Sequence, residues 1–283
     1  MSTYFMCHFI RKSSWLLLVV ILFYSDIISA KVKFYTVVEK TRGASLIFIA
    51  DVVEVKSDHL ILHTTIPLKG SVPKTPINLF WGGQNHSELP ENIVNAKDTI
   101  LVFANPNGNG VYQPFSGVQG ALKLEPGWSS VYEDAITKII RFDSASSPES
   151  KSSILKTMLS GSNQISENSA LEIAYLEYYT GKFRVADLIQ PVMLLTQSPD
   201  KSISLFAIQL LGKIGDKTTV PLLINMLGSQ DEDIASKAYQ VLNLMLDMKL
   251  PIDIKQSYAS RKTSSMHLLK WWNENKETIV LTR

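Results

Sequence analysis

The second half of the chain carries apolar residues at the period of an α-helix. In "LFAIQLLGKIGDKTTVPLLINML" (205–227), apolar residues recur every three or four positions on both sides of a Gly-Asp pair. This pattern predicts two short amphipathic helices joined by a tight turn. Because a pair of helices cannot bury its apolar face alone, we expect neighbouring pairs to stack against it.

The same pattern recurs along the sequence. Segment 200–213 aligns with segment 231–244, and the alignment places Ala207 on Ala238, two small residues that let helices approach closely. A proline stands near the predicted start of each second helix, where its missing N–H costs nothing, at Pro191, Pro221 and Pro251. A period of about thirty residues with these markers predicts a helical repeat.

The first half has a different pattern, made of short runs rich in Val, Ile, Leu and Phe. Turn-forming residues such as Gly, Asn, Pro and Asp separate these runs. Six short strands are therefore predicted, which is typical of a small barrel or sandwich. The runs cover 45–57, 59–66, 76–82, 98–105, 110–115 and 120–125.

Two segments connect or close these halves. Ser130 stands three residues before a glutamate, which predicts a capping-box start for an amphipathic helix. Residues 144–153 are polar and predict a linker, in which Ser147 caps the next helix and Pro148 opens it. The segment 264–277, with its Trp-Trp pair, is predicted to be a last helix that covers the final repeat.

The N-terminus has the three parts of a secretory signal peptide. Two basic residues precede an apolar run from Trp15 to Tyr24, and a short polar stretch then ends at Ala30. Cleavage after Ala30 would remove Cys7, the chain's single cysteine, and leave a protein without disulfides that is periplasmic or secreted. An uncleaved membrane anchor is the alternative, which Asp26 disfavours by interrupting the apolar stretch.

Composition narrows the classes of partner. The chain has 283 residues, 45% of them hydrophobic and 19% charged, with a net charge of +2. A charge so close to zero argues against nucleic acid as the main partner, because phosphates need a concentrated basic face. Once the signal is cleaved, no integral membrane span is predicted, and the expected partner is another protein. The sequence leaves the oligomeric state open.

The search for chemistry finds no predicted catalytic residue, metal ligand set or cofactor site. The mature chain would keep four histidines, His59, His63, His86 and His267. His59 and His63 share a strand face but stand about 13 Å apart, too far to bind one metal ion. No zinc-protease, nucleophile-elbow or phosphate-loop motif is present. We therefore predict a protein that is not an enzyme.

The first half resembles netrin-like domains, the family that includes the tissue inhibitors of metalloproteinases. The resemblance lies in "FIADVVEV", in "IPLKG" before a strand, and in "DTILVFANPNGNGVYQPFSGVQGAL". It implies an oligonucleotide/oligosaccharide-binding (OB) barrel. Inhibition in that family uses an N-terminal cysteine, whereas this mature chain would begin at Lys31 and hold no cysteine. The resemblance therefore carries the fold and not the inhibitor activity.

The second half resembles bacterial HEAT repeats, through "AIQLLGKIGDKTTVPLLINML". The predicted fold class is α+β multidomain, with a small N-terminal OB-like β-barrel and a C-terminal HEAT-type α-helical solenoid. Its predicted parts are a signal peptide (1–30), the netrin-like domain (31–127), a connecting helix and linker (128–150) and the helical repeats (151–283). The predicted function is that of an exported, non-catalytic protein-binding scaffold. An envelope enzyme or protease inhibitor with a site at the domain junction is the alternative.

A concave surface is the predicted binding site. In a helical stack the second helices line this surface, and a fixed period places equivalent residues in a ladder across it. With Val220 and its apolar neighbours turned to the core, we expect the ladder to consist of Val192, Leu195, Leu222, Asn225, Ile252 and Lys255. A partly apolar ladder calls for a cover, which is either a partner or the chain's own barrel.

Overall fold

The computed structural model describes residues 35–74, 76–80, 94–108, 110–115, 117–161 and 163–282. The predicted signal peptide, with Cys7 and the cleavage site at Ala30, lies outside these residues, as does His86. Residues Thr36–Arg283 form one compact unit.

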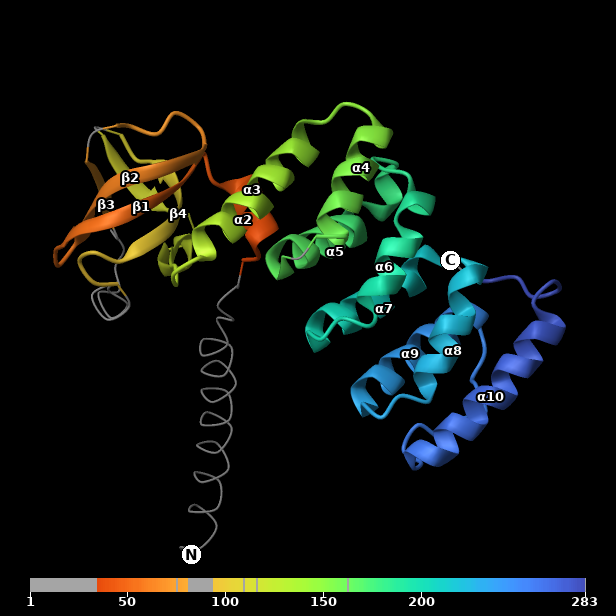
Figure 1. Cartoon of the computed structure of the whole chain (residues 1–283). Helices are drawn as coiled ribbons and strands as arrows, with labels where there is room; N and C mark the ends of the chain where they lie inside the picture. Colours follow the sequence, from red (N-terminus) through yellow and green to blue (C-terminus); the bar gives the residue numbers. More distant parts are fainter. Residues whose placement is uncertain are drawn as a thin grey trace, which may run out of the picture. The chain divides into compact units, whose positions relative to one another are not determined.

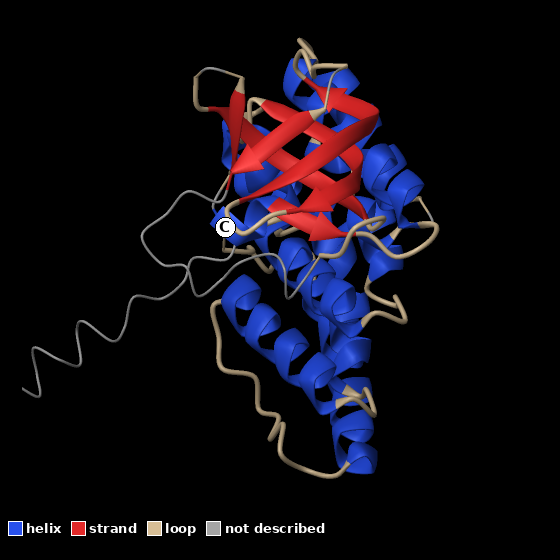
Figure 2. Ribbon diagram, turned by 90° about the vertical axis from the view of Figure 1, so that its left-hand side faces the viewer, coloured by secondary structure: helices blue, strands red, loops and turns tan. Residues whose placement is uncertain are grey.

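The first half of this unit is a closed β-barrel (Figures 1 and 2). The order β1-β2-β3-β5-β4 closes because β4 pairs with β1, and β6 extends the sheet beside β4. The pairing of β3 with β5 is parallel, and the other pairings are antiparallel. Of the two architectures that the sequence allowed, the barrel is confirmed and the sandwich is wrong. The strands are β1 (Leu46–Val55), β2 (His59–Lys69), β3 (Ile77–Phe80), β4 (Thr99–Pro106), β5 (Val111–Pro114) and β6 (Ala121–Lys123).

Strand β1 is buried on both of its faces. Phe48 and Ala50 point into the barrel core, whereas Ile47 and Ile49 join a second cluster outside it. Ile136, from the long helix that follows the barrel, belongs to this second cluster. The unbroken apolar run "LIFIA" follows from this double burial, since a strand with one solvated face would alternate.

A helix that the strand pattern did not predict precedes β1. Helix α2 (Val37–Gly43) starts with a reciprocal capping box, in which the side chains of Thr36 and Glu39 each bond the other's backbone N–H. The strand-like runs predicted for the first half begin only at residue 45, and no helix was predicted before them. Val38 packs into the core of the helical region, so α2 lies against helices rather than joining the sheet (Figure 1).

The rest of the chain is helical. Helices α3, α5, α7 and α9 contact one another in chain order, and α6 and α8 pack against α7 and α9 (Figure 1). No helix in the described ranges is long and apolar enough to cross a membrane. The α-helices are α3 (Trp128–Ser144), α4 (Pro148–Leu159), α5 (Gln164–Glu177), α6 (Ile189–Leu195), α7 (Lys201–Ile214), α8 (Val220–Leu227), α9 (Glu232–Leu246) and α10 (Tyr258–Asn275). Short 3-10 turns occur at Gly117–Gly120, Tyr178–Thr180, Val185–Asp187 and Lys217–Thr219.

The predicted start of α4 is confirmed, whereas those of the connecting helix and of the last helix are wrong, since α10 begins at Tyr258 and not at 264. Ser147 caps α4 and Pro148 opens it, but the connection from α3 is only residues 145–147 and not a ten-residue linker. Ser130 does not cap α3, because α3 starts at Trp128, after a left-handed Gly127. The Ser130 hydroxyl instead donates to the Gly127 carbonyl.

Gly212 allows two helices to pack closely. It lies inside α7 rather than in the turn, and a Cβ there would stand 2.5 Å from Val241 of α9. The missing side chain therefore allows α7 and α9 to approach closely. The turn itself begins at Gly215, which ends α7 in the left-handed conformation.

The third repeat departs from the predicted pattern. Pro251 opens no second helix, because residues 247–257 form an irregular connection. Within it Leu250 and Ile252 are buried while Pro251 and Asp253 are exposed. The Ile252 N–H donates to the Leu250 carbonyl at 2.8 Å, so the chain makes a tight turn at Pro251. Helix α10 packs against α8. Of its tryptophans, Trp272 is buried and Trp271 is half-buried, as expected for a cover over the final repeat.

Candidate functional site

The predicted ladder of six residues does not form one surface. Leu222 is half-buried, and Asn225 and Lys255 are exposed. The other three residues are buried in the two helical cores, namely Val192, Leu195 and Ile252.

The physical reason is a difference of phase between the helices. Pro221 is the second residue of α8, whereas Pro191 is the third residue of α6. One residue of shift turns the helix by about 100°, so Val192 corresponds in position to the buried Leu223 and not to Leu222. Ile252 is buried because its segment is not helical, and the chain turns tightly at Pro251, where the Ile252 N–H donates to the Leu250 carbonyl.

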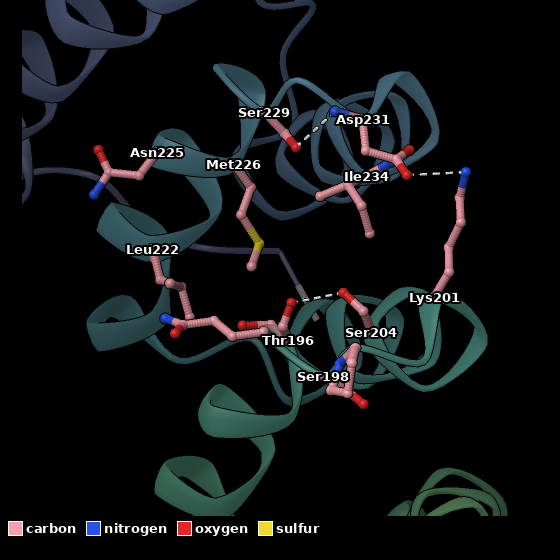
Figure 3. A pocket seen from close by; sticks show the side chains of 12 residues that line it. Thr196, Ser198, Lys201, Ser204, Leu222, Asn225, Met226, Ser229, Asp231 and Ile234 are labelled. Atoms are coloured by element: carbon pink, nitrogen blue, oxygen red, sulfur yellow. Dashed lines mark hydrogen bonds and ion pairs between the residues drawn. The ribbon is translucent and has the colours of Figure 1, made fainter.

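Leu222 and Asn225 lie on a groove of about 430 Å³, which we call the first groove (Figure 3). It is lined by the turn between α6 and α7, the first residues of α7 and α9, and one face of α8. Met226 and Ile234 point into it from one side, and Thr196 and Ser198 face them from the other.

Two equivalent turns build the rims of this groove. The carboxylate of Asp200 accepts the backbone N–H groups of Ser202 and Ile203, and that of Asp231 accepts those of Asp233 and Ile234. Each aspartate in turn donates its own N–H to a serine hydroxyl two residues earlier, Ser198 at 3.2 Å and Ser229 at 3.1 Å. The same Ser-x-Asp triplet therefore begins α7 and α9.

The floor of the groove is polar but internally satisfied. Thr196 and Ser204 are both buried. The Ser204 hydroxyl donates to the Thr196 carbonyl at 2.6 Å, and the Thr196 hydroxyl donates to the Met193 carbonyl at 2.7 Å. Above this floor the half-buried side chains of Leu222, Met226 and Ile234 form an apolar wall.

An ion pair stands at one end of the first groove (Figure 3). The Lys201 ammonium lies 3.0 Å from an Asp231 carboxylate oxygen and also bonds Asp233. The hydrogen bonds to Asp233 and Asp231 raise the pKa of Lys201, and the bond from Lys201 lowers the pKa of Asp231. Both groups therefore stay charged at neutral pH, which suits a structural pair better than proton transfer.

The residues of the first groove are suited to binding. None of the described side chains that line it is a histidine or a cysteine, and none of its hydroxyls lies beside a general base. Among the residues that the structure describes, no three His, Cys, Asp or Glu side chains are grouped to hold a metal ion. His59 instead stacks on Phe80 and bonds Asp58.

Comparisons with models of known families, with curated proteins and with solved structures find no match for this chain. The resemblances to netrin-like domains and HEAT repeats therefore stay predictions.

A second groove of about 590 Å³ adjoins the first. It is lined by the first turns of α3 and α5 and by the end of α6, and it shares Gln197, Ser198 and Pro199 with the first groove. The predicted ladder contributes Leu195 to this second groove. A third, more apolar pocket of about 390 Å³ contains Ile252, His267 and Trp271.

The turn that joins the first two grooves was not predicted as part of a site. The available signal was the repeated Ser-x-Asp triplet, which occurs in "QSPD" and again in "GSQD". Gln197 and Asn225 are exposed, and neither side-chain amide bonds another described residue. Both carboxamides thus have a donor and an acceptor available at the edge of an apolar groove.

Proposed function

We propose that this chain is an exported, non-catalytic scaffold that binds another protein through the first groove. In this proposal residues 151–283 are a short HEAT-type stack, and residues 31–127 are an OB-like barrel of the netrin-like kind. The parallel pairing of β3 with β5 and the return of β4 to β1 support the OB-like assignment. The equivalent starts of α7 and α9 support the repeat assignment.

The binding proposal rests on one observation, which is that an apolar wall and two free side-chain amides line the same groove. Leu222, Met226 and Ile234 offer apolar area that a partner can cover. Asn225 and Gln197 can each donate to and accept from a peptide backbone, since a carboxamide has the same two groups as a peptide bond. An apolar cleft with a few polar groups at its edge is the usual form of a binding site.

Site-specific photo-crosslinking tests this proposal. A photoreactive phenylalanine at position 225 should crosslink a protein of the host's envelope fraction, and Leu222→Glu in the same chain should abolish that crosslink. The same photoreactive residue at position 255, which lines neither groove, is the matched control. Crosslinking that is equal at both positions, or that survives Leu222→Glu, would contradict the proposal.

Export is tested separately. The predicted signal sequence should be cleaved after Ala30, so N-terminal sequencing of the protein from its host should begin at Lys31. A full-length species that stays in the membrane fraction would support the uncleaved anchor instead.

The non-catalytic part of the proposal has its own test. Peptidase and glycosidase substrates should show no turnover with the purified mature protein. Turnover that a single substitution such as Lys201→Ala abolishes would replace the scaffold with the enzyme alternative.

A further inference from the structure

The second groove has an exposed apolar wall. Leu194 and Trp128 line it with 71% and 39% of their surfaces exposed. Because both line the same groove they form one apolar patch, and an apolar patch rimmed by polar residues is typical of a binding surface. Trp128 also packs against Tyr132, with ring centroids 6.0 Å apart, so its ring is held in place at the edge of the groove.

The same groove holds a negative charge that nothing in the described part of the chain neutralises. Glu167 lies on it, half-buried and without an ion-pair partner among the described residues. Burial raises the pKa of Glu167, and the charge of Asp200 raises it further. Lys201 follows Asp200 in the chain, but its ammonium group already pairs with Asp231 and Asp233.

The hydrogen bonds that the Asp200 carboxylate accepts come from neutral groups, so they do not cancel its negative charge. The second carboxylate oxygen of Asp200 accepts only the amide of Gln164, at 2.6 Å. Gln164 itself lines the groove, so the two carboxylates flank the same surface. A cation placed there would be attracted by both carboxylates, and the face of Trp128 would add a cation–π contact.

We infer that the second groove receives a lysine or arginine side chain of an extended peptide segment, whose neighbouring apolar side chain enters the first groove. This inference rests on the proposed function and specifies the partner's chemistry. The two grooves share the lining residues Gln197–Pro199 and therefore lie side by side, and the free amides of Gln197 and Asn225 suit the backbone between the two side chains.

A random library of linear peptides displayed on phage is the probe. Selection on the purified protein should enrich peptides with Lys or Arg beside Leu, Ile, Phe or Trp. For the tightest synthetic peptide, Glu167→Gln should weaken binding by about two- to fivefold, the range of a partly exposed ion pair. Glu274→Gln, an exposed glutamate of α10 that lines neither groove, is the matched control and should leave binding unchanged.

A double-mutant cycle assigns the effect to one contact. Replacing the peptide's basic residue by norleucine should cost at least as much as Glu167→Gln, because it also removes the attraction to Asp200 and the contact with Trp128. For the norleucine peptide, Glu167→Gln should have no further effect on binding. Additive losses, or no effect of Glu167→Gln, would overturn the inference.

The remaining outcomes separate this inference from the proposed function. Enriched peptides without a basic residue that block crosslinking at position 225 would overturn the inference and leave the scaffold proposal standing. If no peptide is enriched, the inference is wrong, and the crosslinking result decides the scaffold proposal by itself.

Discussion

The barrel and the helical region bury their apolar residues by different means. Strand β1 pairs with both β2 and β4, and the closure by β4 joins segments far apart in the chain. Each helix after α4 instead packs mainly on helices one or two places away in the chain order. We therefore expect damage in the barrel to affect all of its strands, and damage in the helices to affect neighbours only.

The largest effect on stability should come from a substitution at a fully buried alanine of α9. Ala238 is fully buried where α9 packs, so Ala238→Arg places a long charged side chain in a space filled by other residues. The free energy of unfolding should fall by about 3–5 kcal/mol. Thermal denaturation measures the loss, and Ala259→Arg on the exposed start of α10 is the control.

Hydrogen exchange in the same variant tests the comparison itself. Protection should fall in α7, α8 and α9 and stay unchanged in β1 and β4, since the damage passes only between neighbours. Equal losses in β1 would mean that the barrel and the helices unfold together.

The second largest effect on stability should appear in residues 247–257, where the predicted third repeat has no second helix. Ile252 is buried and Lys255 is exposed, although only three positions separate them. Ile252→Glu should destabilise the protein by about 2–4 kcal/mol because it buries a carboxylate without a partner. Lys255→Glu should change stability by less than about 0.5 kcal/mol. Chemical denaturation compares the two, and equal effects would restore the predicted helical ladder.

The sequence predicted the features that depend on nearby residues. The apolar period at 205–227 located α7 and α8, and the residue types of Ser147 and Pro148 located the start of α4. The alternating runs located the strands, but their order could not be predicted. A barrel and a sandwich share the same alternation, and only the pairing of β4 with β1 distinguishes them.

The site was less predictable because it depends on helix phase. Leu222 and Asn225 both line the first groove, and their assignment as binding residues stays a prediction. Val192 was misplaced by a one-residue offset of the proline, which no spacing rule reveals. Helix α2 was missed although Thr36 and Glu39 have the spacing of a capping box. The neighbouring valines favoured a strand, and the contact with distant α5 decided otherwise.

Helix α2, which precedes strand β1, is joined to helices α3 and α5 by ion pairs. These ion pairs are sensitive to pH. Arg42 of α2 lies 2.8 Å from Asp143 of α3 and 3.0 Å from Glu177 of α5. Burial alone would raise the pKa of Glu177, but hydrogen bonds from Lys182 and Arg42 and their charges outweigh it and lower that pKa. The native pKa thus lies below the ordinary value of 4.5.

The sign of the pH dependence follows from this lowered pKa. The Glu177 carboxylate stabilises the fold above pH 4.5, and this contribution is lost as the pH falls through the native pKa. Glu177→Gln should cost about 2 kcal/mol at neutral pH. Its stability should then fall less steeply than that of the wild type below pH 4.5. Urea denaturation over a pH series measures both effects, and parallel curves for the two proteins would contradict the assignment.

The smallest effect separates the two roles of Asp231. Its carboxylate caps α9 and also pairs with Lys201 at the end of the first groove. Asp231→Ala removes both interactions and should cost about 1 kcal/mol. Asp231→Asn keeps a capping oxygen and loses only the exposed ion pair, so it should cost less than about 0.5 kcal/mol. If Asp231→Asn costs as much as Asp231→Ala in thermal denaturation, the ion pair and not the cap holds the start of α9. The helical region would then depend on a contact between α7 and α9 where we expect a local one.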